Sequence, residues 1–203
     1  MTQNVDAVSA LIIVDVQVAF VTGEGAVPDA ARVLDRVGAL LTEARARGSL
    51  VVHLQNDGPV DADDETGSPG WELMLPVRPG PREVVIRKTE DDGFDGTSLA
   101  EVLATAEVAG VAVCGVMSEM CVGATARAAL ERGYRVVLPH DAHATYDIPA
   151  APGISEAVPA RMVSRVAEWA LGDEVEIVPH AEDVVFTAVG TDTARPESAE
   201  HPA

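Results

Sequence analysis

Unbroken apolar runs at regular intervals constrain this chain more than any other feature. Residues 9–15 read Ser-Ala-Leu-Ile-Ile-Val-Asp, an apolar run that ends in a carboxylate. Strands of this composition occur in parallel sheets whose two faces are both covered. Five further strands are expected at residues 49–55, 83–88, 111–115, 134–139 and 174–178. Strands that alternate with helices predict an α/β fold with a doubly wound, six-stranded, mostly parallel sheet and helices on both faces, a Rossmann-like three-layer arrangement.

Helical periodicity fills most of the intervals between these runs. A helix is expected from Pro28 to Gly48, where proline suits the first turn and glycine the end. Two more are expected from Leu99 and from about residue 119. The apolar face of the last helix is marked by Val158, Met162, Val166 and Trp169.

The length of 203 residues suits one domain with a sizeable core. We expect this domain to cover residues 1–186, followed by a disordered tail at 187–203, where the composition turns to small and polar residues. Residues 56–82 predict a long acidic loop with a helical turn at 70–76. A loop of this length is often functional, for example as one wall of a binding site.

The charge is strongly negative, because 33 Asp and Glu oppose 14 Lys and Arg, for a formal net charge of −19. Nucleic acid and anionic membranes would repel such a surface, so neither is expected as a partner. No apolar run approaches the length of a membrane span, and no signal peptide is visible. Cys114 and Cys121 are not expected to pair, which predicts a reducing, cytoplasmic location.

Cys121 follows the strand at 111–115 and opens a helical pattern, with Ser118 as the expected N-cap. The unpaired N–H groups and the dipole of a first helical turn favour a thiolate and can stabilise an oxyanion. Cys121 is therefore a candidate nucleophile. The alternative is a small buried packing residue, which is how free cysteines usually behave.

Two other reactive groups fall at the carboxyl ends of strands, where doubly wound sheets bind their ligands. Asp15 ends the first strand and Lys88 ends the third. Asp15 could instead cap a loop, and Lys88 could be an ordinary solvated lysine. Their coincidence with Cys121 at one edge favours a site. Trp71 could line its pocket or cover the edge of the core. No Gly-x-Gly-x-x-Gly motif follows a strand, so nucleotide binding has no support.

Several motifs occur together in an order that resembles the isochorismatase-like cysteine hydrolases, a superfamily that includes nicotinamidases and N-carbamoylsarcosine amidohydrolase. They are Leu11-Ile-Ile-Val-Asp15-Val-Gln17-Val-Ala-Phe20, Val85-Ile-Arg-Lys88, Phe94-Asp-Gly-Thr97-Ser-Leu99, Cys114-Gly-Val-Met-Ser-Glu-Met-Cys121-Val-Gly-Ala-Thr125-Ala, Gly133-Tyr134-Arg-Val and Asp141-Ala. The resemblance spans about residues 9–180.

The resemblance implies a function for each matching position. Cys121 matches the nucleophile, Asp15 the general base and Lys88 the third catalytic residue. A cis peptide bond is expected before Met117, with the N–H groups of Met117 and Cys121 forming the oxyanion hole. The implied reaction is hydrolysis of an amide or lactam carbon–nitrogen bond through a thioester. Expected substrate-binding residues are Gln17, Phe20, Trp71, Asp92 and Phe94.

No metal or other cofactor is expected. Nicotinamidases of this family hold zinc with an aspartate and two histidines behind the second strand, whereas here His53-Leu-Gln-Asn-Asp57-Gly-Pro is followed by no histidine. His140 and His143 could be a ligand pair, but two exposed loop histidines are the favoured interpretation, given what a zinc site needs.

The substrate is expected to be a small amide, with a cationic one as the leading option. Four acidic residues follow Lys88 and could attract a polycation: Glu90, Asp91, Asp92 and Asp95. This region and residues 70–73 are similar to streptothricin hydrolases, which open the lactam of a basic antibiotic. Two alternatives stay open, a nicotinamidase-like hydrolase of another small amide and a non-catalytic binding protein on the same fold. The family further implies a homo-oligomer, either a dimer or a tetramer.

Overall fold

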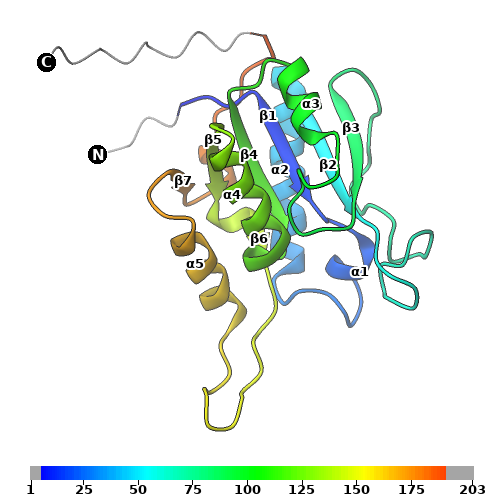
Figure 1. Cartoon of the computed structure of the whole chain (residues 1–203), viewed down its shortest axis with the longest axis vertical. Coiled ribbons are helices and arrows are strands. Elements are labelled where there is room, and N and C mark those ends of the chain that lie inside the picture. Colours follow the sequence, from blue (N-terminus) through cyan, green and yellow to red (C-terminus); the bar gives the residue numbers. More distant parts are fainter. Residues whose placement is uncertain (1–5, 191–203) are drawn as a thin grey trace, which may run out of the picture.

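A parallel sheet forms the centre of the computed structural model, which describes residues 6–190 (Figure 1). Its strand order is β3-β2-β1-β4-β5-β7. These strands are β1 (Ala10–Val14), β2 (Leu50–Asn56), β3 (Glu83–Lys88), β4 (Gly110–Val116), β5 (Arg135–Pro139) and β7 (Val175–Val178). The six predicted strands are confirmed, and their ladders are all parallel. A seventh strand of two residues, β6 (His143–Ala144), pairs with β4 in a segment that was predicted to be loop.

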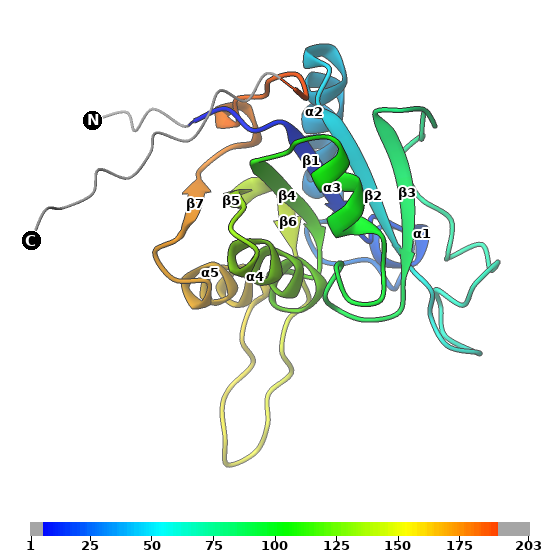
Figure 2. The same cartoon turned by 45° about the horizontal axis from the view of Figure 1, so that its top comes forward.

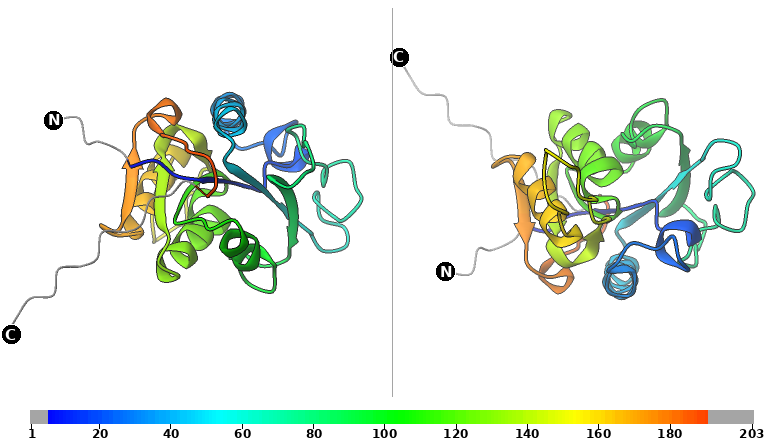
Figure 3. Two further views of the ribbon diagram at one scale, coloured as in Figure 1. Left: turned by 90° about the horizontal axis from the view of Figure 1, so that it is seen from above. Right: turned by 90° about the horizontal axis from the view of Figure 1, so that it is seen from below.

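Helices cover both faces of the sheet, as predicted. α2 (Ala30–Arg47) lies on one face, and α3 (Leu99–Thr105) and α4 (Gly123–Glu131) lie on the other (Figure 3). α5 (Ala160–Ala170) packs against β6 and against η1 (Ser118–Val122), the π-helical turn that precedes α4. The remaining short elements are α1 (Val18–Val21), η2 (His140–Ala142) and η3 (Ala181–Asp183).

The central strand β1 explains why its sequence is apolar without interruption. Leu11 and Ile13 pack in the core on the α2 side, whereas Ile12 and Val14 pack in the core on the side of α3 and α4. Each of these side chains is buried, and burial of one such side chain contributes about 1.5–3 kcal/mol. Two apolar layers thus fix β1 in the sheet and bring Asp15 to its carboxyl edge.

The order of the strands reverses beside β1. β2 and β3 follow on one side of β1, and β4, β5 and β7 follow on the other. This reversal creates a switch point between β1 and β4, where doubly wound sheets have their ligand crevice. Asp15, Lys88 and Cys121 follow or end strands at this edge.

The predicted apolar face of α5 is not its buried face. Met162, Val166 and Trp169 are 48%, 62% and 76% exposed. The helix instead buries Ser164 and Glu168, whose side chains bond to polar groups beneath α5. The pattern identified the helix correctly, but the side chains that pack inward include polar ones.

The predicted boundary of the tail is also too early. The Ser49 hydroxyl donates to the carbonyl of Thr187 at 2.7 Å, and the Thr187 N–H donates to the carbonyl of Val8 at 2.9 Å. Residues 187–189 are therefore bonded to the domain. The rest of the predicted tail, 191–203, lies outside the described residues.

Two long connections have no helix or strand of regular length. Residues 57–82 contain turns and isolated bridges but no helix, so the predicted helical turn at 70–76 is wrong. Residues 145–159 form a loop with two nearly adjacent legs that projects from the body (Figures 1 and 2). Between residues 6 and 190, no helix combines the length and apolarity that crossing a membrane requires.

Candidate active site

The ammonium group of Lys88 connects the three side chains that the sequence predicted to be catalytic. Lys88 Nζ lies 2.8 Å from Asp15 Oδ2 and 3.3 Å from Cys121 Sγ. It also donates to the carbonyl of Glu90 at 3.1 Å and lies 3.5 Å from Asn56 Oδ1. All three predicted side chains are buried. Residues from the ends of β1, β3 and β4 thus meet in one cluster.

Uncommon backbone conformations surround this cluster. Asp15 has a φ of 49°, and Gly115 has a φ of 118°. A Cβ at Gly115 would lie 2.1 Å from the carbonyl oxygen of Val14, so only glycine fits where β4 passes β1. The peptide bond between Val116 and Met117 is cis, as the resemblance implied.

Ser118 does not have the predicted capping role. η1 begins after Met117, and no side chain caps it. The Ser118 hydroxyl instead bonds to Nδ1 of His143 at 2.8 Å and to the hydroxyl of Ser164 at 2.9 Å. The segment that carries Cys121 is thereby bonded to β6 and α5. Sequence reasoning missed this because the partners lie 25 and 46 residues away.

Burial and charge shift the pKa values of all three residues. Burial raises the pKa of Asp15 despite the neighbouring ammonium, and Asp15 Oδ1 has no hydrogen-bond partner among the described residues. Burial opposes the charge of Lys88, but Asp15 and the Cys121 sulfur together raise its pKa. Both raised pKa values fit the geometry. The Lys88 ammonium has several acceptors, whereas one oxygen of the Asp15 carboxylate has no donor among the described residues. Burial and then Asp15 raise the pKa of Cys121, which disfavours the thiolate.

A second carboxylate contacts the sulfur. The Cys121 thiol donates to Asp91 Oδ1 across 3.4 Å, and Asp91 is exposed. The sequence had predicted its neighbour Asp92 to bind substrate. Asp92 Oδ1 accepts the Phe94 N–H at 2.8 Å, so its carboxylate stabilises the turn. The acidic turn itself was the signal, but sequence alone did not say which of its carboxylates reaches the sulfur.

Three other residues that were predicted to bind substrate have contacts within the protein. Gln17 is buried and bonds through its side chain to backbone groups of Asn56 and Trp71, so it holds the long loop. Phe20 packs against the core on the α2 side. Phe94 is buried on the opposite side, where it stacks on Tyr134.

Trp71 does not line the cavity beside Lys88 but contacts two residues that do, Asp57 and Arg87. Its indole N–H donates to Asp57 Oδ1 at 2.8 Å, and the guanidinium of Arg87 lies over its ring. The cavity measures about 350 Å³. Its lining comprises Asp57, Arg87, Lys88, Thr89, Glu90, Asp95, Gly96 and Thr97. Lys88 therefore borders both the cavity and the thiol.

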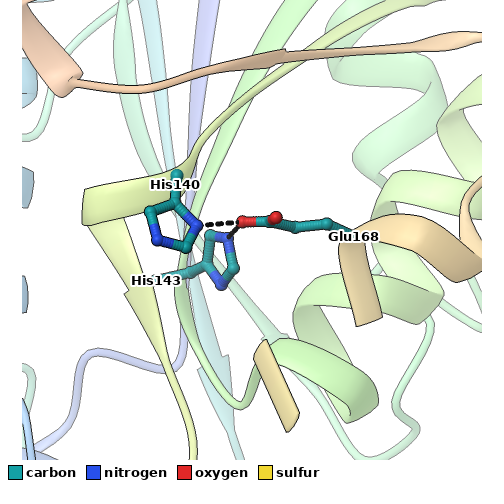
Figure 4. A group of neighbouring side chains, drawn as sticks. All are labelled: His140, His143 and Glu168. Carbon is teal, nitrogen blue, oxygen red and sulfur yellow. Dashed lines mark hydrogen bonds and ion pairs between the residues drawn. The ribbon is translucent and has the colours of Figure 1, made fainter. Parts of the chain in front are cut away.

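His140, His143 and Glu168 form the one group of potential metal ligands among residues 6–190 (Figure 4). Glu168 Oε1 lies 2.5 Å from His140 Nδ1 and 3.1 Å from His143 Nε2. The expectation of two exposed histidines is wrong for His143, which is buried. Two histidines and a carboxylate can hold zinc. The three side chains can also satisfy one another's hydrogen-bonding groups, because His140 Nδ1 and His143 Nε2 each have the Glu168 carboxylate as a partner.

The sequence profile of the isochorismatase domain matches residues 9–170. The chain belongs to the isochorismatase family. Two proteins of Streptomyces noursei that are named streptothricin hydrolase are 70% and 69% identical to this family member over 181 residues. Each alignment covers 89% of the present chain, and the alignments cover 72% and 66% of the two relatives. An isochorismatase from Pseudomonas putida KT2440 superimposes with a TM-score of 0.78 at 28% identity, over 87% of this chain and 90% of the other. The resemblance and the fold predicted from the sequence are confirmed.

Proposed function

We propose that this isochorismatase-family hydrolase is a metal-independent cysteine amidohydrolase that opens the lactam of streptothricin or of a similar cationic amide. The observation that carries the proposal is the contact of the Lys88 ammonium with both the Asp15 carboxylate and the Cys121 sulfur. This arrangement combines a nucleophile, a base and a cation that offsets the repulsion between the two anions.

The free oxygen of Asp15 supplies the proton acceptor. Asp15 Oδ1 takes the proton of the Cys121 thiol, and the thiolate attacks the carbonyl carbon to form a tetrahedral oxyanion. The N–H groups of Met117 and Cys121 are the predicted donors to that oxyanion. The carbon–nitrogen bond then breaks, and the amine leaves with the proton held by Asp15. Asp15 then takes a proton from water, the hydroxide hydrolyses the thioester, and Asp15 returns the proton to the departing sulfur.

Two observations support a cationic substrate. The two Streptomyces noursei relatives at 70% and 69% identity are named streptothricin hydrolase. The net charge of −19 favours the approach of a cation, and the exposed carboxylates of Glu90 and Asp95 line the cavity beside Lys88. Hydrolysis of a neutral amide such as nicotinamide is the alternative. The cytoplasmic location and the homo-oligomer stay predictions.

Turnover of matched variants tests this proposal. The wild-type protein should open streptothricin, and Cys121→Ala should lower kcat by about 10³-fold or more. Cys114→Ala is the control, because Cys114 is buried in β4 away from the cluster. Turnover of nicotinamide but not of streptothricin would replace the substrate. Absence of turnover across neutral, acidic and basic amides would leave the non-catalytic binding protein.

A further inference from the structure

The cluster around the thiol has one more negative group than its single cation can balance. The charged groups that face Cys121 Sγ are Asp15 behind β1, Lys88 at the end of β3 and Asp91 in the turn that follows β3. Lys88 is paired with Asp15 at 2.8 Å. Asp91 lies 3.4 Å from the sulfur, is exposed, and forms no ion pair with any cation among residues 6–190. A carboxylate in this position opposes formation of a thiolate.

The position of Asp91 is built into the fold. The turn is held against α4 by Thr125, whose hydroxyl accepts the Gly93 N–H at 3.0 Å and donates to the Asp91 carbonyl at 3.4 Å. A Cβ at Gly93 would lie 2.4 Å from a methyl group of Leu54, so the turn approaches the core as closely as glycine allows. The carboxylate therefore lies beside the sulfur because its backbone is anchored on both sides.

We propose that Asp91 is a specificity-determining residue that binds a cationic group of the substrate and thereby couples substrate binding to activation of Cys121. The proposal rests on the proposed function of Cys121 as the nucleophile. In the empty enzyme Asp91 adds to burial and to Asp15 in disfavouring the thiolate. An ammonium or guanidinium group that pairs with Asp91 removes this contribution, so the thiolate forms more readily when a cationic substrate is present.

The coupling is reciprocal. If a cation at Asp91 favours the thiolate, the thiolate favours binding of the cation by the same factor. Burial and the charges of Asp15 and Asp91 act in one direction on the pKa of Cys121, which they raise, and Lys88 acts in the other. Only Asp91 among these carboxylates is exposed and able to meet a ligand. Neutral amides lack the cation and should therefore be poorer substrates in kcat as well as in KM.

Two thiol reagents of matched size test this coupling without any substrate. A methanethiosulfonate transfers its alkylthio group to the thiolate, forms a mixed disulfide and releases methanesulfinate. We would compare the cationic 2-aminoethyl reagent with the neutral 2-hydroxyethyl reagent on wild type and Asp91→Asn, with Cys121→Ala as the background. In Asp91→Asn the neutral reagent should react about two- to fivefold faster, and the ratio of cationic to neutral rates should fall by a similar factor. Glu101→Gln removes the same charge from the exposed surface of α3 and should change neither value by as much.

The direction of the change decides the result. A slower neutral reaction in Asp91→Asn would assign Asp91 as the proton acceptor of the thiol and overturn the proposal. An unchanged rate ratio would overturn it as well. With streptothricin, Asp91→Asn should lower kcat/KM, whereas with a neutral amide kcat/KM should hold or rise. If wild type does not open streptothricin, the proposed substrate fails, but the two reagents still decide the role of Asp91.

Discussion

Two buried carboxylates of this protein, Asp15 and Glu83, both contact a cation, yet their pKa values move in opposite directions. The Asp15 carboxyl has a raised pKa because burial outweighs the attraction of Lys88. Burial also acts to raise the pKa of Glu83, but its hydrogen bonds lower it to about 2. Both residues are almost inaccessible, at 1% and 5% exposure. Asp15 nevertheless lies deeper in the protein than Glu83, so burial opposes its charge more strongly.

The number of hydrogen-bond donors adds to this difference in pKa. Arg45 donates to both oxygens of Glu83 at 2.8 and 2.6 Å, and His53 and the Arg78 N–H lie 3.0 and 2.9 Å away. Among residues 6–190, Asp15 Oδ1 has no donor. The comparison shows that the scaffold satisfies its buried charge completely, whereas the candidate active site leaves an acceptor free. A free acceptor lowers stability and is what a proton acceptor requires.

The largest effect that would sharpen this comparison is expected from Asp15→Asn. Loss of the proton acceptor should lower kcat by about 10²–10⁴-fold. The substitution relieves the cost of burying an ionised Asp15 but leaves the buried Lys88 ammonium without its anion, so the free energy of unfolding at pH 7 should fall by less than in Glu83→Gln. Steady-state turnover and urea unfolding of the same samples measure both. A loss of stability as large as that of a Glu83 variant would break the comparison.

Substitution of Glu83 should affect stability rather than turnover. Glu83→Gln leaves Arg45 without its anion and should lower the free energy of unfolding by about 3 kcal/mol, with kcat of the folded enzyme unchanged. The pKa of Glu83 is depressed in the folded state, so its contribution is present above its ordinary value of 4.5 and lost as the pH falls from there toward 2. Asp15 has a raised pKa, so its ionisation has the opposite effect on the free energy of unfolding and lowers it as the pH rises. Chemical denaturation of wild type and variant between pH 7 and pH 3 should therefore converge as the pH falls.

Much of the fold could be predicted because apolar periodicity is local. The run at 9–15 and the end of the helix at Gly48 were sufficient for β1 and α2. The resemblance to a family located Asp15, Lys88 and Cys121, since each lies within a motif. Side-chain partners could not be predicted in the same way. The bonds of Gln17 to the loop at 56–71 and of Ser118 to Ser164 join residues that no sequence spacing relates.

Ser118 connects the hydrogen-bonded scaffold to the candidate active site. Its substitution should have an effect of intermediate size on both stability and turnover. Its hydroxyl joins the satisfied cluster of His143 to the segment that carries Cys121. Ser118→Ala should lower the free energy of unfolding by about 1–3 kcal/mol, because His143 Nδ1 loses its buried partner. A displaced nucleophile should also lower kcat by a few-fold, with KM little changed. The control is Thr42→Ala, which removes an exposed hydroxyl that bonds only within its own helix. Equal losses in the two variants would mean that Ser118 has no positioning role.

The smallest effect is expected from removal of metal ions. Glu168 resembles Glu83, because the hydrogen bonds of His143 and His140 hold its pKa below the usual range although burial opposes them. Arg165 lies 3.3 Å from its second oxygen. A carboxylate with donors on both oxygens is satisfied without an ion, so dialysis against a chelator should change kcat/KM by less than about twofold and leave the melting temperature unchanged. Loss of activity that zinc restores in wild type, but not in His140→Ala, would instead identify His140, His143 and Glu168 as a metal site. Glu168 would then be paired with an ion rather than with its neighbours, and its likeness to Glu83 would no longer hold.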